Sequence, residues 1–173
     1  MKRQKGFSLI ELLIVVAIIL IIAAIAIPNL LRAKMAANEA SAVGSERTIV
    51  TSEISYQAAQ WANAAGQPIG YSARLQDLGG ANCANVGVVS TSTAACLIDN
   101  SLATAIAGAP PKSGYNFTYA ITSTSGPTNT GFSINADPAT VGQTGQRHFY
   151  TDGTGVIRSN AAAVATANDA PIQ

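Results

Sequence analysis

Residues that commonly carry chemistry are scarce in this sequence of 173 residues. It holds one histidine, His148, and two cysteines, Cys83 and Cys96. These three cannot supply the four ligands of a closed zinc site, and no Cys-x-x-Cys-His run is present to attach haem. No Gly-x-Ser-x-Gly nucleophile motif accompanies His148, which alternates with Phe149 in a short strand-like run. We therefore expect a solvent-facing His148, no enzymatic activity, no catalytic residue, no metal and no cofactor.

Other polar groups fit turns or surface modification. Asp137-Pro138 and Asp152-Gly153 could offer oxygens to calcium, but without EF-hand spacing we expect turns at both places. The stretch 122–130 offers many hydroxyl groups for glycans on an exposed loop. Asn116-Phe117-Thr118 fits an N-glycan acceptor pattern, although its strand-like setting weakens that signal.

The charge distribution argues against a nucleic-acid partner. Lys2, Arg3 and Lys5 stand within the first five positions, so residues 6–173 carry seven basic and nine acidic groups. Such a body has no basic excess to bind phosphate backbones, and we predict no specific nucleic acid. A composition of 48% hydrophobic and 11% charged residues also excludes a disordered chain.

The basic start leads directly into a long apolar segment. Residues 12–27 are all apolar, and the run back to Phe7 is broken only by Ser8 and Glu11. This meets the length of about 20 residues that a membrane helix needs, and the preceding charges place the N-terminus in the cytoplasm. Two alternatives are a secretory signal cut after Ala26, which frees a soluble protein, and a permanent anchor with a costly carboxylate at Glu11.

The run KGFSLIELLIVV at residues 5–16 resembles the class III signal of type IV pilins and type II secretion pseudopilins. The resemblance is close over residues 1 to about 35 and architectural beyond them. It implies that a membrane-embedded aspartyl peptidase cuts between Gly6 and Phe7 and methylates the new N-terminus at Phe7. It also implies an assembly role for Glu11 and a helix kink at Pro28. Because Glu11 has no basic side chain nearby, we expect it to pair with the amine that cleavage creates.

In an exported domain Cys83 and Cys96 most simply form a disulfide worth about 3 kcal/mol, with a reactive thiol or an intermolecular bridge as alternatives.

A helix is predicted from Phe7 to about Ala65, and it should protrude because it is far longer than a small domain. Its second half should pack an apolar stripe against a sheet, with Glu39, Glu46 and Glu53 on other faces. The stripe comprises Ala36, Ala40, Val43, Arg47, Val50, Ile54, Ala58, Trp61 and Ala65.

Short elements are predicted after this helix. Ser72 should cap a short helix that ends at Leu78 and Gly79, and a second should cover residues 97–107. Period-two alternation predicts strands from Tyr115, at 132–134, at 147–151 and at 156–158, the last two joined by the turn 152–155.

The predicted fold is α+β and pilin-like: a long N-terminal helix packed on an antiparallel sheet of about four strands. The predicted segments are a leader (1–6), a transmembrane and filament-core helix (7–28), the second helix half (29–65), a loop region with both cysteines (66–113), the sheet (114–160) and an exposed tail (161–173).

The resemblance implies a bacterial type IV pilin precursor. Such a protein is held in the inner membrane and is processed by the prepilin peptidase and N-methyltransferase. An inner-membrane assembly platform then builds like subunits into a helical extracellular filament for adhesion or motility. The alternatives are a pseudopilin of a type II secretion system and a soluble periplasmic domain released after Ala26.

Overall fold

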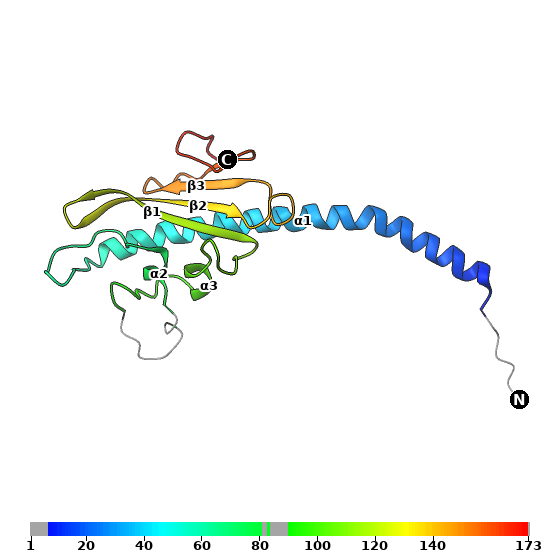
Figure 1. The fold of residues 1–173 in the computed structure, drawn as a ribbon, viewed down its shortest axis with the longest axis horizontal. Coiled ribbons are helices and arrows are strands. Elements are labelled where there is room, and N and C mark those ends of the chain that lie inside the picture. Colours follow the sequence, from blue (N-terminus) through cyan, green and yellow to red (C-terminus); the bar gives the residue numbers. More distant parts are fainter. Residues whose placement is uncertain (1–6, 81–82, 84–89, 173) are drawn as a thin grey trace, which may run out of the picture. The chain divides into compact units, whose positions relative to one another are not determined.

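The computed structural model describes residues 7–80, 83 and 90–172. The elements are helices α1 (Leu9–Ala58), α2 (Leu75–Leu78) and α3 (Asn100–Ala103), then strands β1 (Tyr115–Ser125), β2 (Thr128–Pro138), β3 (His148–Asp152) and β4 (Arg158–Asn160) (Figure 1). The chain divides into two compact units, Met1–Lys34 and Met35–Gln173. The long helix and the four-stranded antiparallel sheet confirm the predicted α+β class.

Helix α1 contains Pro28 and ends earlier than its sequence period suggests. The ring of Pro28 removes one backbone donor, yet the helix continues through it. The predicted end near Ala65 is wrong, because α1 stops at Ala58. The side-chain oxygen of Asn63 accepts the N–H groups of Ala65 and Gln67 at 2.9 and 3.0 Å. Such side-chain bonding offers the backbone an alternative to the helical pattern, and a turn forms.

The sheet has the strand order β1-β2-β3-β4, and every neighbouring pair is antiparallel. Alternation places Phe117 of β1, Phe132 and Ile134 of β2 and Phe149 of β3 on the buried side. The polar stretch 122–130 is not simply a loop, because β1 and β2 extend through most of it. Strand β4 also starts two residues later than the predicted position, at Arg158.

The buried face of α1 differs from the predicted stripe. Its buried positions within the second unit are Glu39, Ala42, Ser45, Glu46, Ile49, Val50, Ser52, Glu53 and Tyr56. Of the predicted stripe only Val50 belongs to this set, while Ala36, Ala40, Arg47, Ile54 and Ala58 are exposed. The apolar members of the buried face share one core with the inner face of the sheet. The prediction failed because the apolar count treated glutamate as a residue of the outer face.

The two short helices depart from their predicted starts. Helix α2 has Arg74 at its N-cap with no side-chain cap, so Ser72 does not cap it. Helix α3 covers Asn100–Ala103 rather than 97–107, and the carboxylate of Asp99 caps it by accepting the N–H of Leu102. The C-cap of α2 at Gly79 agrees with the predicted stop.

The C-terminal segment packs against strand β4, contrary to the expected loose tail. The N–H of Ser159 donates to the carbonyl of Ala170 at 3.1 Å, and the N–H of Ile172 donates to that of Ile157 at 2.9 Å. Ala165 is buried, and its carbonyl accepts the Asn135 amide at 2.7 Å. Most side chains of residues 161–172 are exposed, but these contacts attach the segment to β2 and β4.

Candidate processing and assembly segment

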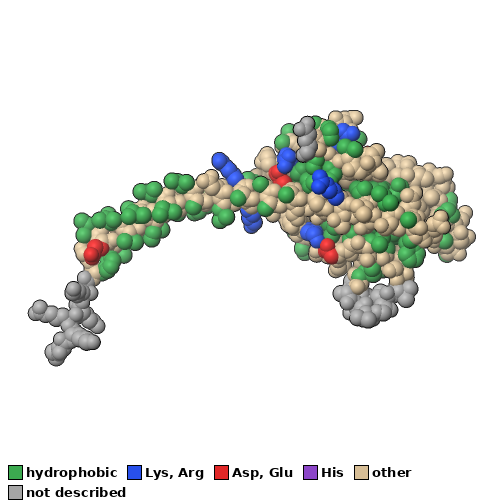
Figure 2. All heavy atoms as spheres, turned by 180° about the vertical axis from the view of Figure 1, so that it is seen from behind, with side chains coloured by type: hydrophobic (Ala, Val, Ile, Leu, Met, Phe, Trp, Pro, Cys, Tyr) green, Lys and Arg blue, Asp and Glu red, His purple; other side chains and the backbone are tan. Residues whose placement is uncertain are grey.

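The first unit presents apolar side chains on all sides of its helix. Every leucine, isoleucine and valine from Leu9 to Leu31 is exposed, from 42% for Leu31 to 79% for Leu9. Figure 2 shows these hydrophobic side chains along the N-terminal half of α1. Among the described residues, α1 is the one helix long and apolar enough to cross a membrane. A contiguous apolar surface of this size marks a contact with lipid or with other protein.

Glu11 caps the start of this helix. Its Oε2 accepts the backbone N–H of Ser8 at 2.9 Å, and Ser8 precedes the first helical residue, Leu9. The spacing Ser-x-x-Glu is that of a capping box, in which the third helical residue reaches back to the N-cap N–H. The sequence contained this signal, although Glu11 was predicted only to act in assembly. The negative charge also lies at the positive end of the helix dipole, which is a favourable place for it.

The other predicted site residues of the first unit are Gly6, Phe7 and Pro28. Gly6 is outside the described residues, so cleavage between Gly6 and Phe7 stays a prediction. Phe7 is 74% exposed, and no described element covers it. Pro28 lies inside α1 with helix on both sides, and its predicted kink also stays a prediction. The structure thus brings Phe7, Ser8 and Glu11 together at one helix start.

Three glutamates at seven-residue spacing, Glu39, Glu46 and Glu53, lie on the buried face of α1. Sequence reasoning missed them, although Ala42, Ile49 and Tyr56 follow each glutamate three residues later on the same face.

Glu39 joins α1 to the chain before β3. Its Oε1 accepts the N–H groups of Gln146 and Arg147, and its Oε2 pairs with the Arg147 guanidinium at 2.8 Å. Burial alone would raise the pKa of Glu39, but these hydrogen bonds outweigh it and hold the pKa below its usual value. Glu39 is therefore an ionised anchor for the α1–sheet contact.

Glu46 has the opposite environment. Its side chain is fully buried, and neither carboxyl oxygen has a hydrogen-bond partner in the described part of the chain. Burial raises the pKa of Glu46 to about 8, and the charge of Asp137 adds to this effect. Glu46 is accordingly a neutral acid at pH 7, because an unpaired charge in the core would carry a large desolvation cost.

Glu53 is bonded to Ser72, the residue predicted as a helix cap. The Ser72 hydroxyl donates to Oε1, and the Ser72 N–H donates to Oε2 at 3.0 Å. Burial raises the pKa of Glu53, while these two hydrogen bonds oppose the shift. The contact ties the segment before α2 to α1, which explains why Ser72 is unavailable as a cap.

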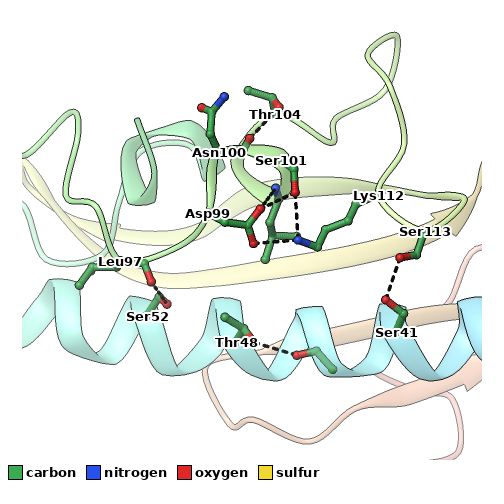
Figure 3. Close-up of polar contacts among 12 residues, drawn as sticks. Ser41, Thr48, Ser52, Leu97, Asp99, Asn100, Ser101, Thr104, Lys112 and Ser113 are labelled. Atoms are coloured by element: carbon green, nitrogen blue, oxygen red, sulfur yellow. Dashed lines mark hydrogen bonds and ion pairs between the residues drawn. The ribbon is translucent and has the colours of Figure 1, made fainter. Parts of the chain in front are cut away.

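Figure 3 shows the polar contacts between α1 and the segment around α3. Ser41 Oγ donates to Ser113 Oγ at 2.9 Å, and Ser52 Oγ donates to the carbonyl of Leu97 at 3.4 Å. Beside them, Lys112 Nζ pairs with Asp99 at 2.7 Å. Cys96 lies directly before this segment and forms the predicted disulfide with Cys83.

The remaining polar candidates have structural contacts. His148 is half-buried rather than solvent-facing, and its Nδ1 pairs with Asp137 at 2.6 Å. Asp152 accepts the N–H of Thr154 at 2.9 Å in the turn after β3. Asn116 lies within β1 and is not fully exposed. Among the described residues, no group of three or more His, Cys, Asp or Glu side chains could hold a metal ion.

Comparison with known proteins supports the importance of the first unit. Residues 1–27 match the family model for the prokaryotic N-terminal methylation motif. A relative from Thermus thermophilus, the type IV wide pilus major component PilA4, is 64% identical over 39 residues. The N-terminal segment therefore carries a prokaryotic N-terminal methylation motif and is similar to that of a type IV pilus component. The match to the Thermus protein covers 22% of this chain and 30% of the relative's length. No solved structure matches the chain.

Proposed function

We propose that this chain is the precursor of a structural subunit of a type IV pilus. The observation that carries the proposal concerns the first unit. Its helix is apolar and exposed, and its sequence matches the methylation motif. The helix leads into a second unit that has its own core. Such a helix is stable in a bilayer or among like helices, because both environments exclude water and the helix satisfies its own backbone. The same segment can hold the precursor in the membrane and then form the centre of a filament.

In this mechanism the chain is the substrate and the building unit. The peptidase cuts between Gly6 and Phe7 and methylates the amine of Phe7. The assembly platform then moves the mature helix from lipid into the growing filament. The contacts of the second unit keep its surface intact during this transfer: its own core, the Glu39–Arg147 ion pair and the Cys83–Cys96 disulfide.

Glu11 has two successive partners in this proposal. In the structure its carboxylate accepts one N–H, from Ser8, through Oε2. After cleavage the amine of Phe7 adds a positive charge in the same region, and a neighbouring subunit can bring another. A carboxylate among apolar helices is costly unless it is paired, so the new amine favours assembly of processed subunits.

The test is the mass and N-terminal sequence of the chain in purified surface filaments. We expect a chain that begins at N-methylated Phe7 in fibres visible by electron microscopy. A mature chain that begins at Ile27 would contradict the proposal and indicate a soluble secreted protein. Processing at Phe7 without long surface fibres would instead indicate a secretion pseudopilin.

A further inference from the structure

The apolar part of α1 ends abruptly at two basic residues. Leu30 and Leu31 are still exposed hydrophobic residues, and Arg32 and Lys34 follow directly. Both basic side chains are exposed, and neither forms an ion pair within the described residues. Long basic side chains at this position can lie along apolar surface and extend their charged ends to a phosphate-rich interface.

The distance from Glu11 to this basic pair matches the thickness of a membrane. Arg32 lies twenty-one residues after Glu11 in the same helix. At about 1.5 Å per residue this separation is about 32 Å, close to the thickness of about 30 Å of a bilayer's hydrocarbon core. When Glu11 lies at one interface, Arg32 and Lys34 therefore lie at the other.

The two basic side chains point to opposite sides of the helix. Residues two positions apart are separated by about 200° around an α-helix, so they do not face one another. A second protein helix packed on one side would meet only one of them. In a bilayer, by contrast, lipid headgroups would surround the helix at this depth and meet both side chains.

We propose that Arg32 and Lys34 bind phospholipid phosphates at the membrane face from which the second unit emerges. This inference rests on the proposed storage of the precursor in the membrane. The pair fixes how deeply the apolar segment sits, and its phosphate contacts are broken when the subunit leaves the bilayer. We assign membrane lipids as the partner of both residues, because lipid phosphates supply negative charge on all sides of the helix.

The test compares lipid selectivity in vesicles that contain phosphatidylcholine and phosphatidylglycerol. The full-length chain is reconstituted, and electron spin resonance measures how strongly spin-labelled phosphatidylglycerol associates with it relative to labelled phosphatidylcholine. The double variant Arg32→Gln/Lys34→Gln should lower this relative association several-fold, since one basic residue at an anionic surface contributes about five-fold. Added salt should likewise lower the preference of the unchanged chain for phosphatidylglycerol.

Arg47→Gln is the matched control, because Arg47 is an exposed basic residue of α1 in the second unit. This control should keep the original selectivity. Equal selectivity of the double variant and the unchanged chain would overturn the inference. Selectivity lost only at high protein-to-lipid ratio would overturn it too, because that result assigns the pair to contacts between copies. A chain that shows no motionally restricted lipid is not inserted, which would instead contradict the membrane stage of the proposed function.

Discussion

At the scale of single residues, Glu11 combines an observed helix cap with the docking role proposed above. Its bond to Ser8 uses one carboxylate oxygen and stabilises the start of α1. The other oxygen has no hydrogen bond in the described structure, so it can accept one from an amine while the cap stays formed. The observed cap and the proposed docking contact are therefore compatible in the same side chain.

Replacement of Glu11 with valine should separate processing from assembly. We expect Glu11→Val to be cut at Gly6 and retained in the membrane, yet to form few filaments, because the new amine loses its negative partner. Ile14→Val is a control that changes an apolar side chain of the same segment. Immunoblots of sheared surface fractions measure the result, and abundant full-length fibres of Glu11→Val alone would show that the charge pair is unnecessary.

The buried acid Glu46 should make the second unit less stable as pH rises. Its pKa is about 8 in the folded chain against 4.5 for the unperturbed group. The contribution of the neutral acid to the free energy of unfolding is complete below about pH 4.5 and is lost as the pH approaches 8. The free energy of unfolding then falls by up to about 1.4 kcal/mol per pH unit. Glu46→Gln should flatten this dependence, measured by denaturant unfolding of the full chain in detergent at several pH values.

The carboxylate of Glu39 should affect the pH dependence of stability in the opposite direction, and Glu39→Gln tests this in the same experiment. The folded pKa of Glu39 is lowered, so its ionised form stabilises the chain above about pH 4.5 and this effect disappears in acid. The Glu39→Gln variant should therefore lose stability at neutral pH and resemble the unchanged chain at low pH. Equal pH profiles for the two variants would contradict the assigned protonation states.

At the scale of elements, the start of α3 depends on one side chain with two tasks. Asp99 accepts the N–H of Leu102 at 2.9 Å and pairs with Lys112 at 2.7 Å. The bond from Lys112 is the main cause that lowers the pKa of Asp99 to about 2. Because the Asp99 side chain is 56% exposed, the ion pair is screened and the cap should matter more.

We expect Asp99→Ala to lower the free energy of unfolding by about 1 kcal/mol, the usual cost of losing an N-cap. Lys112→Met removes the ion pair but leaves the cap, and it should cost about 0.5 kcal/mol or less. Both values come from denaturant titrations at pH 7. A larger loss in the lysine variant would show that the ion pair, rather than the cap, holds this segment.

Sequence-based prediction was more successful for the strands than for the buried face of α1. The strands were predicted well because Tyr115, Phe117 and Phe132 follow the simple period of two, which local chain geometry enforces. The buried face of α1 was not predicted correctly. Burial of Glu39 and Glu53 depends on partners more than fifteen residues away in the sequence, namely Arg147 and Ser72. A hydrophobic pattern contains no information about such distant partners.

At the scale of the whole molecule, the disulfide contributes to the stability of the second unit. It joins Cys83 to Cys96, next to the segment that contacts α1 through Leu97 and Ser52. Loss of such a bridge in small exported domains typically costs about 2–5 kcal/mol. We expect the Cys83→Ser/Cys96→Ser variant to unfold at a correspondingly lower denaturant concentration. An unchanged midpoint would show that the core alone holds this region.

The segment after β4 has a further consequence for subunits that are crowded together. It bonds to the side of β4 that faces away from β3, and Pro171, which has no N–H to donate, forms the bridge to Arg158. An uncovered edge strand is a template for pairing with another chain, and proline is one of the residues that prevents such pairing. Removal of this segment would open a polymerisation route between sheets. The final residues thus keep the outer edge of β4 from pairing with the sheet of another chain.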